Sequence, residues 1–251
     1  MGPVFGGAVF YSAAQAKQAL RFWREFAAES PDELVTQGGS FQLPDGTPVF
    51  GIAACYCGGV EQGERVLKAL RTFGPPLADV LGPMSYIQIQ SMFEPFFPPG
   101  RRVYTKSNFL KQLSDEAIKT MVQFVAKSPS PYTFAPFIEH WNGTATRVAP
   151  TDTAFPHRQY EWNFLAWSMW TEPVGDEKNV QWTRECWEAM RPFLGTGSYG
   201  NYVTDEGEAI AREAYGQNYN RLVTLKNKYD ATNFFRLNHN VRPSQAAQTV
   251  S

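Results

Sequence analysis

The sequence has few of the residues from which metal and redox sites are usually built. It contains three cysteines and three histidines among 251 residues. Cys55 and Cys57 are two positions apart in a segment predicted to be a strand, so both side chains point to one face. That spacing fits neither a zinc ligand set nor a CxxC redox pair, and the histidines are scattered. The sequence therefore predicts no metal site, and we expect the cysteines to be small buried thiols.

Net charge and long apolar runs are also missing. The formal net charge is −1, which gives no reason to expect nucleic acid or an anionic membrane as a partner. The first residues, MGPVFGGAVFYS, have no basic region and no long apolar core, so they predict neither a signal peptide nor a membrane span. With 43% hydrophobic and 15% aromatic residues, the composition is typical of a soluble globular protein, and the cytoplasm is the expected location.

Common catalytic motifs are absent as well. The sequence has no nucleophile elbow and no HExxH, which leaves a hydrolase without support. It also has no GxGxxG and no P-loop. The glycine pairs Gly38-Gly39 and Gly58-Gly59 stand alone, and we expect them to be turns rather than phosphate-binding loops.

Hydrophobic periodicity predicts an α+β fold, an antiparallel sheet with helices packed on one face. The predicted strands are 3–11, 33–43, 48–57, 86–91, 132–140 and 161–170. The first predicted helix begins after Ser12, which forms a capping box with Gln15 ahead of an apolar stripe. The other predicted helices span 62–73, begin at Ser114, and span 179–190. Pro44, Asp45 and Gly46 predict the turn of a hairpin between 33–43 and 48–57.

One strand prediction carries a site prediction. Residues 86–91 alternate Ile87 and Ile89 with Gln88 and Gln90, which is typical of a strand with one apolar and one polar face. A polar sheet face that no helix covers must meet water, a ligand or another domain. Gln88 and Gln90 are therefore predicted to bind substrate.

The stretch 197–243 holds the most informative pattern. Tyr199 and Tyr202 flank Asn201 in a glycine-interrupted run that predicts a short strand, in which Gly200 permits a bulge that turns both phenols inward. A helix with apolar residues from Tyr219 to Tyr229 follows, and the ending FFRLNHNVRP predicts a docking strand.

This stretch resembles the C-terminal end of the berberine bridge enzyme-like FAD-linked oxidoreductases, in the p-cresol methylhydroxylase and vanillyl-alcohol oxidase group. The matching positions include Tyr199, Asn201, Tyr202, Asp205, Ala214-Tyr215-Gly216, Asn218, Arg221-Leu222, Lys226, Tyr229-Asp230, Asn233, Phe235 and Asn238-His239-Asn240. Upstream, further matches are Gly6-Gly7, Pro31 to Leu34, Tyr86, Gln90, Gly100-Arg101, Tyr104, Lys106-Ser107 and Thr153 to Arg158. One departure is Ala231, where the family usually carries a proline. A match of many parts at consistent spacing is more specific than any short motif.

The resemblance implies removal of a hydride to FAD from a C–H bond next to a hydroxyl or amine. Tyr202 is the implied proton acceptor, with Tyr199 as its catalytic partner, and Asn201, Tyr202 and Asn240 are the implied cofactor contacts. A phenol has an ordinary pKa of about 10, so it needs positive charge or hydrogen bonds to act as a base. Packing is the alternative role of both tyrosines, and capping is that of Asn240. For His157-Arg158 the alternatives are a pocket position and a turn whose arginine pairs with an acid.

The family's flavin-binding domain has no counterpart in this sequence. We therefore expect a substrate-binding domain over 1–195, a C-terminal segment over 196–243 that closes on a flavin domain, and a disordered tail over 244–251. The expected partners are a small-molecule substrate and a flavin domain that is missing or on a separate chain, and the chain alone is expected to be inactive. A binding module that has lost flavin, without turnover, is the alternative.

Overall fold

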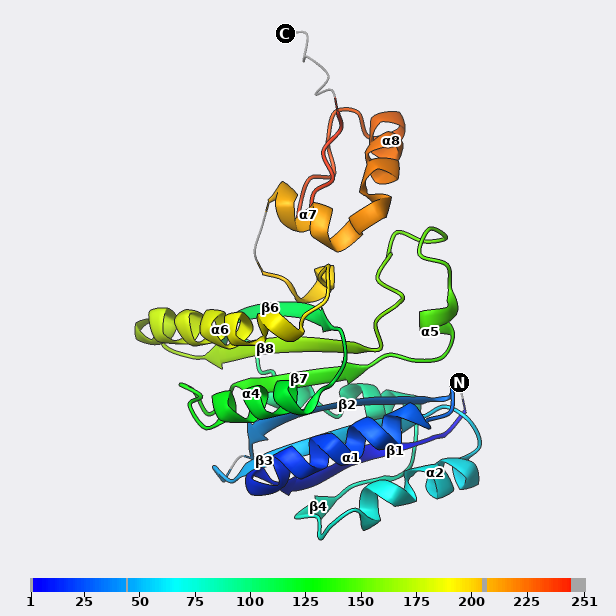
Figure 1. The fold of residues 1–251 in the computed structure, drawn as a ribbon, viewed down its shortest axis with the longest axis vertical. Helices are drawn as coiled ribbons and strands as arrows, with labels where there is room; N and C mark the ends of the chain where they lie inside the picture. Colours follow the sequence, from blue (N-terminus) through cyan, green and yellow to red (C-terminus); the bar gives the residue numbers. More distant parts are fainter. Residues whose placement is uncertain (1, 44, 205–206, 245–251) are drawn as a thin grey trace.

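The computed structural model describes residues 2–43, 45–204 and 207–244, and its centre is an eight-stranded sheet. The strands follow the order β4-β1-β3-β2-β7-β8-β6, with β5 paired to β1, and every pairing is antiparallel (Figure 1). Their bounds are β1 Val4–Ser12, β2 Leu34–Gln42, β3 Pro48–Tyr56, β4 Ala78–Asp79, β5 Gly82–Met84, β6 Arg102–Leu110, β7 Phe134–His140 and β8 Trp162–Trp170.

Four helices cover one face of this sheet. They are α1 Ala16–Ala28, α2 Val60–Thr72, α4 Asp115–Val125 and α6 Asp176–Met190, and Figure 1 shows them on the same side of the strands. Their apolar stripes meet alternate residues of the strands in the main core, which includes Leu20, Trp23, Phe50, Ile118 and Phe164. Because side chains alternate across a strand, the other residues of each strand face away from these helices. The α+β fold with helices on one face is confirmed.

Local signals set the starts of the helices. The Gln15 side chain accepts hydrogen bonds from the Ser12 backbone N–H and hydroxyl, at 3.2 and 2.9 Å, and a 3₁₀ turn over Ala13–Gln15 leads into α1. Ser114 Oγ accepts from the Ala117 N–H at 3.2 Å, at the start of α4. Both predicted caps are present because each satisfies an N–H group that the first helical turn leaves without a partner.

The Gly38-Gly39 pair lies inside β2, so the prediction of a turn there was wrong. A Cβ added at Gly38 would lie 2.9 Å from the Trp23 ring, and Trp23 Nε1 donates to Thr36 Oγ1 at 2.9 Å. The missing side chain lets α1 pack closely on β2. The predicted hairpin of β2 and β3 is confirmed, although Pro44 of its turn lies outside the described residues.

The strand predicted at 86–91 is a short helix instead, α3 Tyr86–Ser91. The Ser85 hydroxyl accepts from the Gln88 N–H at 3.2 Å, and the Gln88 side chain accepts from the Ser85 N–H at 2.8 Å. This capping box outweighs the two-residue alternation, which is weak over so few residues. α3 lies on the sheet face opposite the four large helices, where Ile89 approaches Gly6.

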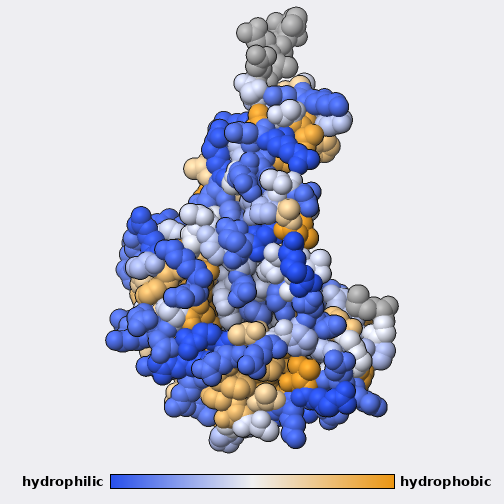
Figure 2. All heavy atoms as spheres, turned by 45° about the vertical axis from the view of Figure 1, so that its right-hand side comes forward, coloured by the Kyte–Doolittle hydropathy of each residue, from blue (hydrophilic) through white to orange (hydrophobic). Residues whose placement is uncertain are grey.

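The C-terminal part projects beyond the sheet as a narrower body (Figures 1 and 2). It contains α7 Glu208–Tyr215 and α8 Tyr219–Tyr229, the second of which was predicted. Two strand predictions were wrong here, because Gly200–Tyr202 is a 3₁₀ turn and the described residues after α8 contain no strand. Ser244 is held by Asn227 through two hydrogen bonds. The rest of the predicted tail, 245–251, and Asp205 lie outside the described residues.

None of the helices in the described part of the chain is both long and apolar enough to cross a bilayer.

Gly63 offers a test of how tightly α2 packs on the sheet. Glycine to alanine inside a helix normally stabilises a protein by about 1 kcal/mol. A Cβ at Gly63 would lie 2.6 Å from Phe5 Cβ and 2.9 Å from the Tyr56 ring, so overpacking should reverse the sign. We expect Gly63→Ala to lower the free energy of unfolding by about 1 to 3 kcal/mol, measured by urea denaturation.

Glu64→Ala is the matched control, because Glu64 is exposed on the same helix. It should change the free energy of unfolding by less than about 0.5 kcal/mol. A stabilising Gly63→Ala variant would contradict the packing.

Candidate functional site

The sheet face opposite the four large helices carries a row of polar side chains near its β6 edge. Gln37, Glu139 and Asn163 are direct cross-strand neighbours on β2, β7 and β8. Ser107 adds a hydroxyl from β6, and Ser107, Glu139 and Asn163 are all buried. Polar groups inside a sheet are costly unless they are hydrogen-bonded, so this row needs internal partners.

Glu139 is the centre of the hydrogen-bond network. Its Oε1 accepts from the Tyr202 hydroxyl at 2.7 Å. Its Oε2 accepts from Asn163 Nδ2 at 3.0 Å and from Trp141 Nε1 at 3.3 Å. Asn163 Oδ1 in turn accepts from the Ser107 hydroxyl at 3.0 Å. Three donors thus replace the water that the Glu139 carboxyl group loses on burial.

Gly197 brings the tyrosines to this network. It has a φ of +88°, and a Cβ there would overlap the His157 ring, so only glycine fits. The following residues cross β6, where the Thr105 hydroxyl donates to the Tyr202 carbonyl at 2.7 Å. The two phenol rings meet edge to face with centroids 5.1 Å apart. The predicted meeting of Tyr199 and Tyr202 thus occurs in a 3₁₀ turn rather than a bulged strand.

The two phenols differ in their surroundings. Burial, together with the nearby Glu139 carboxylate, raises the pKa of Tyr202 well above its ordinary value. Tyr199 is half-buried, and its hydroxyl accepts from Asn201 Nδ2 at 2.8 Å. Its ring packs against Trp141 and Phe155 at centroid distances of 5.0 and 5.9 Å. Tyr202 is therefore a donor to a buried acid, whereas Tyr199 belongs to an aromatic wall.

Two clefts adjoin this network on the open face. The larger, of about 420 Å³, is lined by Val35, His140, Trp141, Asn142, Ala145, Phe155, Arg158 and Tyr199. The smaller, of about 210 Å³, is lined by Val35, Gln37, Ala53, Ala54, Cys55, Ile89, Gln90 and Phe93. Val35 borders both, and its side chain is 54% exposed. An aromatic wall with a few polar groups is typical of small-molecule sites.

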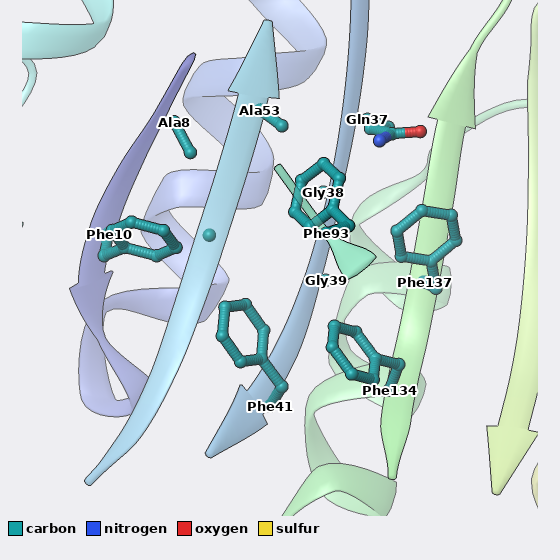
Figure 3. A pocket seen from close by; sticks show the side chains of 11 residues that line it. Ala8, Phe10, Gln37, Gly38, Gly39, Phe41, Ala53, Phe93, Phe134 and Phe137 are labelled. Atoms are coloured by element: carbon teal, nitrogen blue, oxygen red, sulfur yellow. The ribbon is translucent and has the colours of Figure 1, made fainter. Parts of the chain in front are cut away.

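A third cavity nearby is lined by aromatic side chains. Figure 3 shows Phe10, Phe41, Phe93, Phe134 and Phe137 gathered over β1, β3, β2 and β7, and the last of these strands carries Phe134 and Phe137. Its volume is about 20 Å³, enough for about one water molecule. These rings therefore form a second small core that anchors the segment after α3, and the candidate site lies in the two clefts beside the Glu139 network.

The predicted substrate residues behave differently from each other. Gln90 lines the smaller cleft, whereas the Gln88 side chain is used in the cap of α3. Among the predicted cofactor residues, Asn201 is exposed and bonded to Tyr199. Asn240 is half-buried, and its Oδ1 has no partner within the described residues.

The cysteines were predicted to be buried, and this holds for Cys186 alone. Cys55 is half-buried and Cys57 is exposed. Their side chains share one face as expected, because Cys57 continues the strand ladder through its N–H bond to the Glu33 carbonyl at 2.9 Å. Cys55 forms part of the wall of the smaller cleft.

His157 and Arg158 occupy separate environments. His157 is buried, and its Nε2 lies 3.0 and 3.1 Å from the carbonyls of Glu213 and Ala214. The Arg158 guanidinium donates to the carbonyls of Phe155 and Ala145 and to a threonine hydroxyl, instead of to an acid, and it borders the larger cleft. The predicted alternative, a turn in which Arg158 pairs with an acid, was therefore wrong.

Sequence reasoning missed Glu139, Asn163 and Ser107. A signal was present, because the segment FIEHW places a carboxylate in an aromatic run that is too apolar for a surface strand. A charged residue in such a run needs a buried partner. The partner is Tyr202, 63 residues away in sequence, and one sequence gives no means of pairing them.

Known proteins match both the C-terminal segment by itself and the chain over most of its length. Residues 198–242 match the family model described as berberine and berberine like. An FAD-linked oxidoreductase of Dictyostelium discoideum is 28% identical over 246 residues, which cover 96% of this chain and 52% of that protein. Tetrahydroberberine oxidase of Berberis wilsoniae is 27% identical over 38% of this chain and 21% of its own length.

Solved structures share the fold. The 6-hydroxy-D-nicotine oxidase of Arthrobacter nicotinovorans superposes with a TM-score of 0.79 at 18% identity, covering 95% of this chain and 55% of that one. The berberine bridge enzyme of Eschscholzia californica gives a TM-score of 0.78 at 18% identity, covering 96% and 55%. The chain spans about half the length of the curated relatives it matches over most of its residues.

The fold and the C-terminal match are similar to those of FAD-linked oxidoreductases. Within that class, the chain is similar to berberine bridge enzyme-like proteins, over residues 198–242 for the family model and over most of the chain for the fold.

His140, in the wall of the larger cleft, gives a test of burial. Burial lowers its pKa to about 4, so the folded protein keeps it neutral while the unfolded chain takes up a proton below about pH 6.5. Stability from this group is therefore complete above about pH 6.5 and is lost as the pH falls towards 4. We expect a loss of about 2.5 kcal/mol in the free energy of unfolding between pH 7 and 4.5, measured by urea denaturation.

His140→Gln is the control, because it removes the titrating ring while His157 and the carboxyl groups remain. The variant should lose about 2.5 kcal/mol less than the parent over the same range. Parallel pH profiles for the two proteins would contradict the buried neutral ring.

Proposed function

We propose that this chain is the substrate-binding and C-terminal part of an FAD-dependent oxidoreductase that removes a hydride from a C–H bond next to a hydroxyl or amine. FAD, when bound, would accept the hydride. The observation that carries the proposal is the contact of the Tyr202 hydroxyl with the buried Glu139 carboxyl group, at 2.7 Å beside an aromatic cleft.

The proton needs a path that a lone phenol cannot supply. Loss of a hydride becomes easier as the neighbouring O–H or N–H loses its proton. Burial and Glu139 raise the pKa of Tyr202, so a free phenolate is disfavoured. Tyr202 therefore acts as a proton acceptor only if its own proton moves at the same time to Glu139 Oε1. Glu139 is the final acceptor in this scheme, and Asn163 and Trp141 hold its other oxygen.

Unpartnered polar atoms in the C-terminal segment fit a flavin ring and its domain. Ser198 Oγ, His239 Nδ1 and Asn240 Oδ1 are buried polar atoms without a partner in the described residues. Buried polar atoms are normally hydrogen-bonded, so a surface that supplies their partners is expected. Asn240 could accept from an N–H of the isoalloxazine ring, and Asn201 and Tyr202 lie in the turn at the network.

Exposed apolar side chains in the same segment support docking to a flavin domain. Phe234, Phe235 and Leu237 are 77%, 76% and 84% exposed. Three large apolar residues within four positions are unusual on a free surface. Residues 196–243 are thus proposed to close on a flavin domain, with 1–195 forming the substrate wall.

The cleft suggests a class of substrate. Its wall combines Trp141, Phe155 and Tyr199 with the backbone-bonded Arg158. Flat aromatic or alicyclic alcohols and amines would stack on this wall. Relatives named as oxidases of tetrahydroberberine and 6-hydroxy-D-nicotine are consistent with this class.

Removal of the Tyr202 hydroxyl tests the proton path. In the flavin-loaded protein, Tyr202→Phe should slow flavin reduction by substrate by about 100-fold or more, because general-base catalysis contributes about that much. Glu139→Gln should slow it similarly. Stopped-flow absorbance of the flavin is the measurement.

Tyr199→Phe keeps the aromatic wall and serves as the control, with an expected loss below about 10-fold. Unchanged reduction in both Tyr202→Phe and Glu139→Gln would remove this pair from the proton path.

A second experiment tests the partner. The chain alone should stay colourless after incubation with FAD, and should bind a separately expressed flavin domain from a relative with loss of exposed apolar surface. Phe234→Ser with Leu237→Ser should weaken that binding by at least about 10-fold, since each buried side chain contributes about 1.5 to 3 kcal/mol. Calorimetry or gel filtration gives the affinity.

The matched control is Val174→Ser, because Val174 is 93% exposed but lies before α6 on the sheet body. It should leave the affinity unchanged. An equal loss in both variants would contradict docking through the C-terminal segment.

A binding module without turnover is the second candidate, and one observation favours it. The larger cleft is formed by this chain alone, so a ligand could bind without flavin. Binding of an aromatic amine to the colourless chain, with no association with any flavin domain, would favour the module.

A further inference from the structure

The half-buried and exposed thiols of Cys55 and Cys57 lie together on the open side of the sheet. Their sulfur atoms are 3.8 Å apart. Cys55 is the next-to-last residue of β3 and pairs with Val35 on β2, while Cys57 is the first residue after that strand. Both face away from the main core, and Cys55 borders the cleft that contains Gln90. Neither thiol takes part in the proposed hydride transfer.

The spacing of the two residues is compatible with a disulfide. Two steps along a strand separate the Cα atoms by about 6.6 Å, within the range of about 4.4 to 6.8 Å seen for disulfides. A bond would require the sulfur atoms to approach from 3.8 Å to about 2.05 Å. Cys57 is the first residue after β3 and is followed by two glycines, so the movement requires its N–H to shift from the Glu33 carbonyl, which accepts it at 2.9 Å.

We propose that Cys55 and Cys57 form a reversible dithiol–disulfide pair that a peroxide oxidises, in the wall of the smaller cleft. Cys57 is the first nucleophile because it is exposed. Its thiolate attacks one peroxide oxygen, the O–O bond breaks, and a sulfenic acid and water form. The Cys55 sulfur then attacks the sulfenic sulfur, and the S–O bond breaks with release of a second water. Two thiols and one hydrogen peroxide thus give one disulfide and two waters.

The surroundings of the thiols assign the order of these steps. Burial raises the pKa of the Cys55 thiol to about 12, so it is a poor first nucleophile. It is well placed to attack second, because its partner sulfur is already beside it. Cys186 is 1% exposed within the main core, and it should not react. The pair is therefore selective within the chain's three cysteines.

Because the pair lies in the wall of the smaller cleft, its oxidation would change the shape of that cleft. Cys55 is the direct strand neighbour of Val35, and Val35 borders both clefts. Closure of the disulfide would draw the Cys55 side chain towards the end of β3 and alter the cleft wall beside Gln90. Because the thiols react without flavin, this inference stands or fails separately from the proposed redox function.

Thiol counting and mass spectrometry of the folded chain test the pair. After treatment with a small excess of hydrogen peroxide and removal of the oxidant, thiols titrated in denaturant should fall from three to one. The intact mass should drop by two hydrogen atoms, and a peptide containing both Cys55 and Cys57 should carry the loss. Dithiothreitol should restore three thiols and the original mass.

Three variants sharpen the result. Cys186→Ala should fall from two thiols to none, with the same loss of two hydrogens. Cys55→Ser and Cys57→Ser should both fail to lose two hydrogens, and Cys55→Ser should instead gain oxygen at Cys57. The inference is overturned if the parent gains oxygen without losing two hydrogens, if it forms only linked dimers on a non-reducing gel, or if all three thiols persist.

Discussion

The pleat of one antiparallel sheet is the constraint on which the other features depend. Because alternate side chains point to opposite faces, four helices can bury one set of residues while the other set stays available. Glu139 and Ile138 are adjacent in sequence, yet Ile138 belongs to the main core and Glu139 meets Tyr202 on the far side. A shift of one residue in the register of β7 would exchange them, placing a carboxylate under the helices.

Much of this architecture could be predicted from the sequence because it depends on local signals. The Ser12 and Ser114 caps fix the starts of their own helices, and turn residues between 33–43 and 48–57 predict the hairpin. The family resemblance of the C-terminal stretch is carried by spacing along the chain. The strand prediction for residues 86–91 was wrong because six positions hold only three alternations. The Ser85 cap is an equally short signal, but it decided the local structure. Turn chemistry was the stronger signal there.

The site was harder to predict because it is made of contacts across long sequence distances. Tyr202 could be singled out by resemblance, but its partner Glu139 lies 63 residues earlier. The direction of the Tyr202 pKa could not be foreseen, since it follows from burial and from that carboxylate. A sequence can propose that a phenol is a base, whereas the structure shows which carboxyl group accepts a hydrogen bond from that phenol.

The His157 ring lies in the space that a side chain at position 197 would need. The histidine ring fills the volume in which any other residue at 197 would place its Cβ, and the same ring supports the start of the turn that carries both phenols. Evolutionary change at either position is therefore coupled to the other. A lineage could enlarge residue 197 only after shrinking residue 157, and would pass through an intermediate with a hole where the turn is now supported.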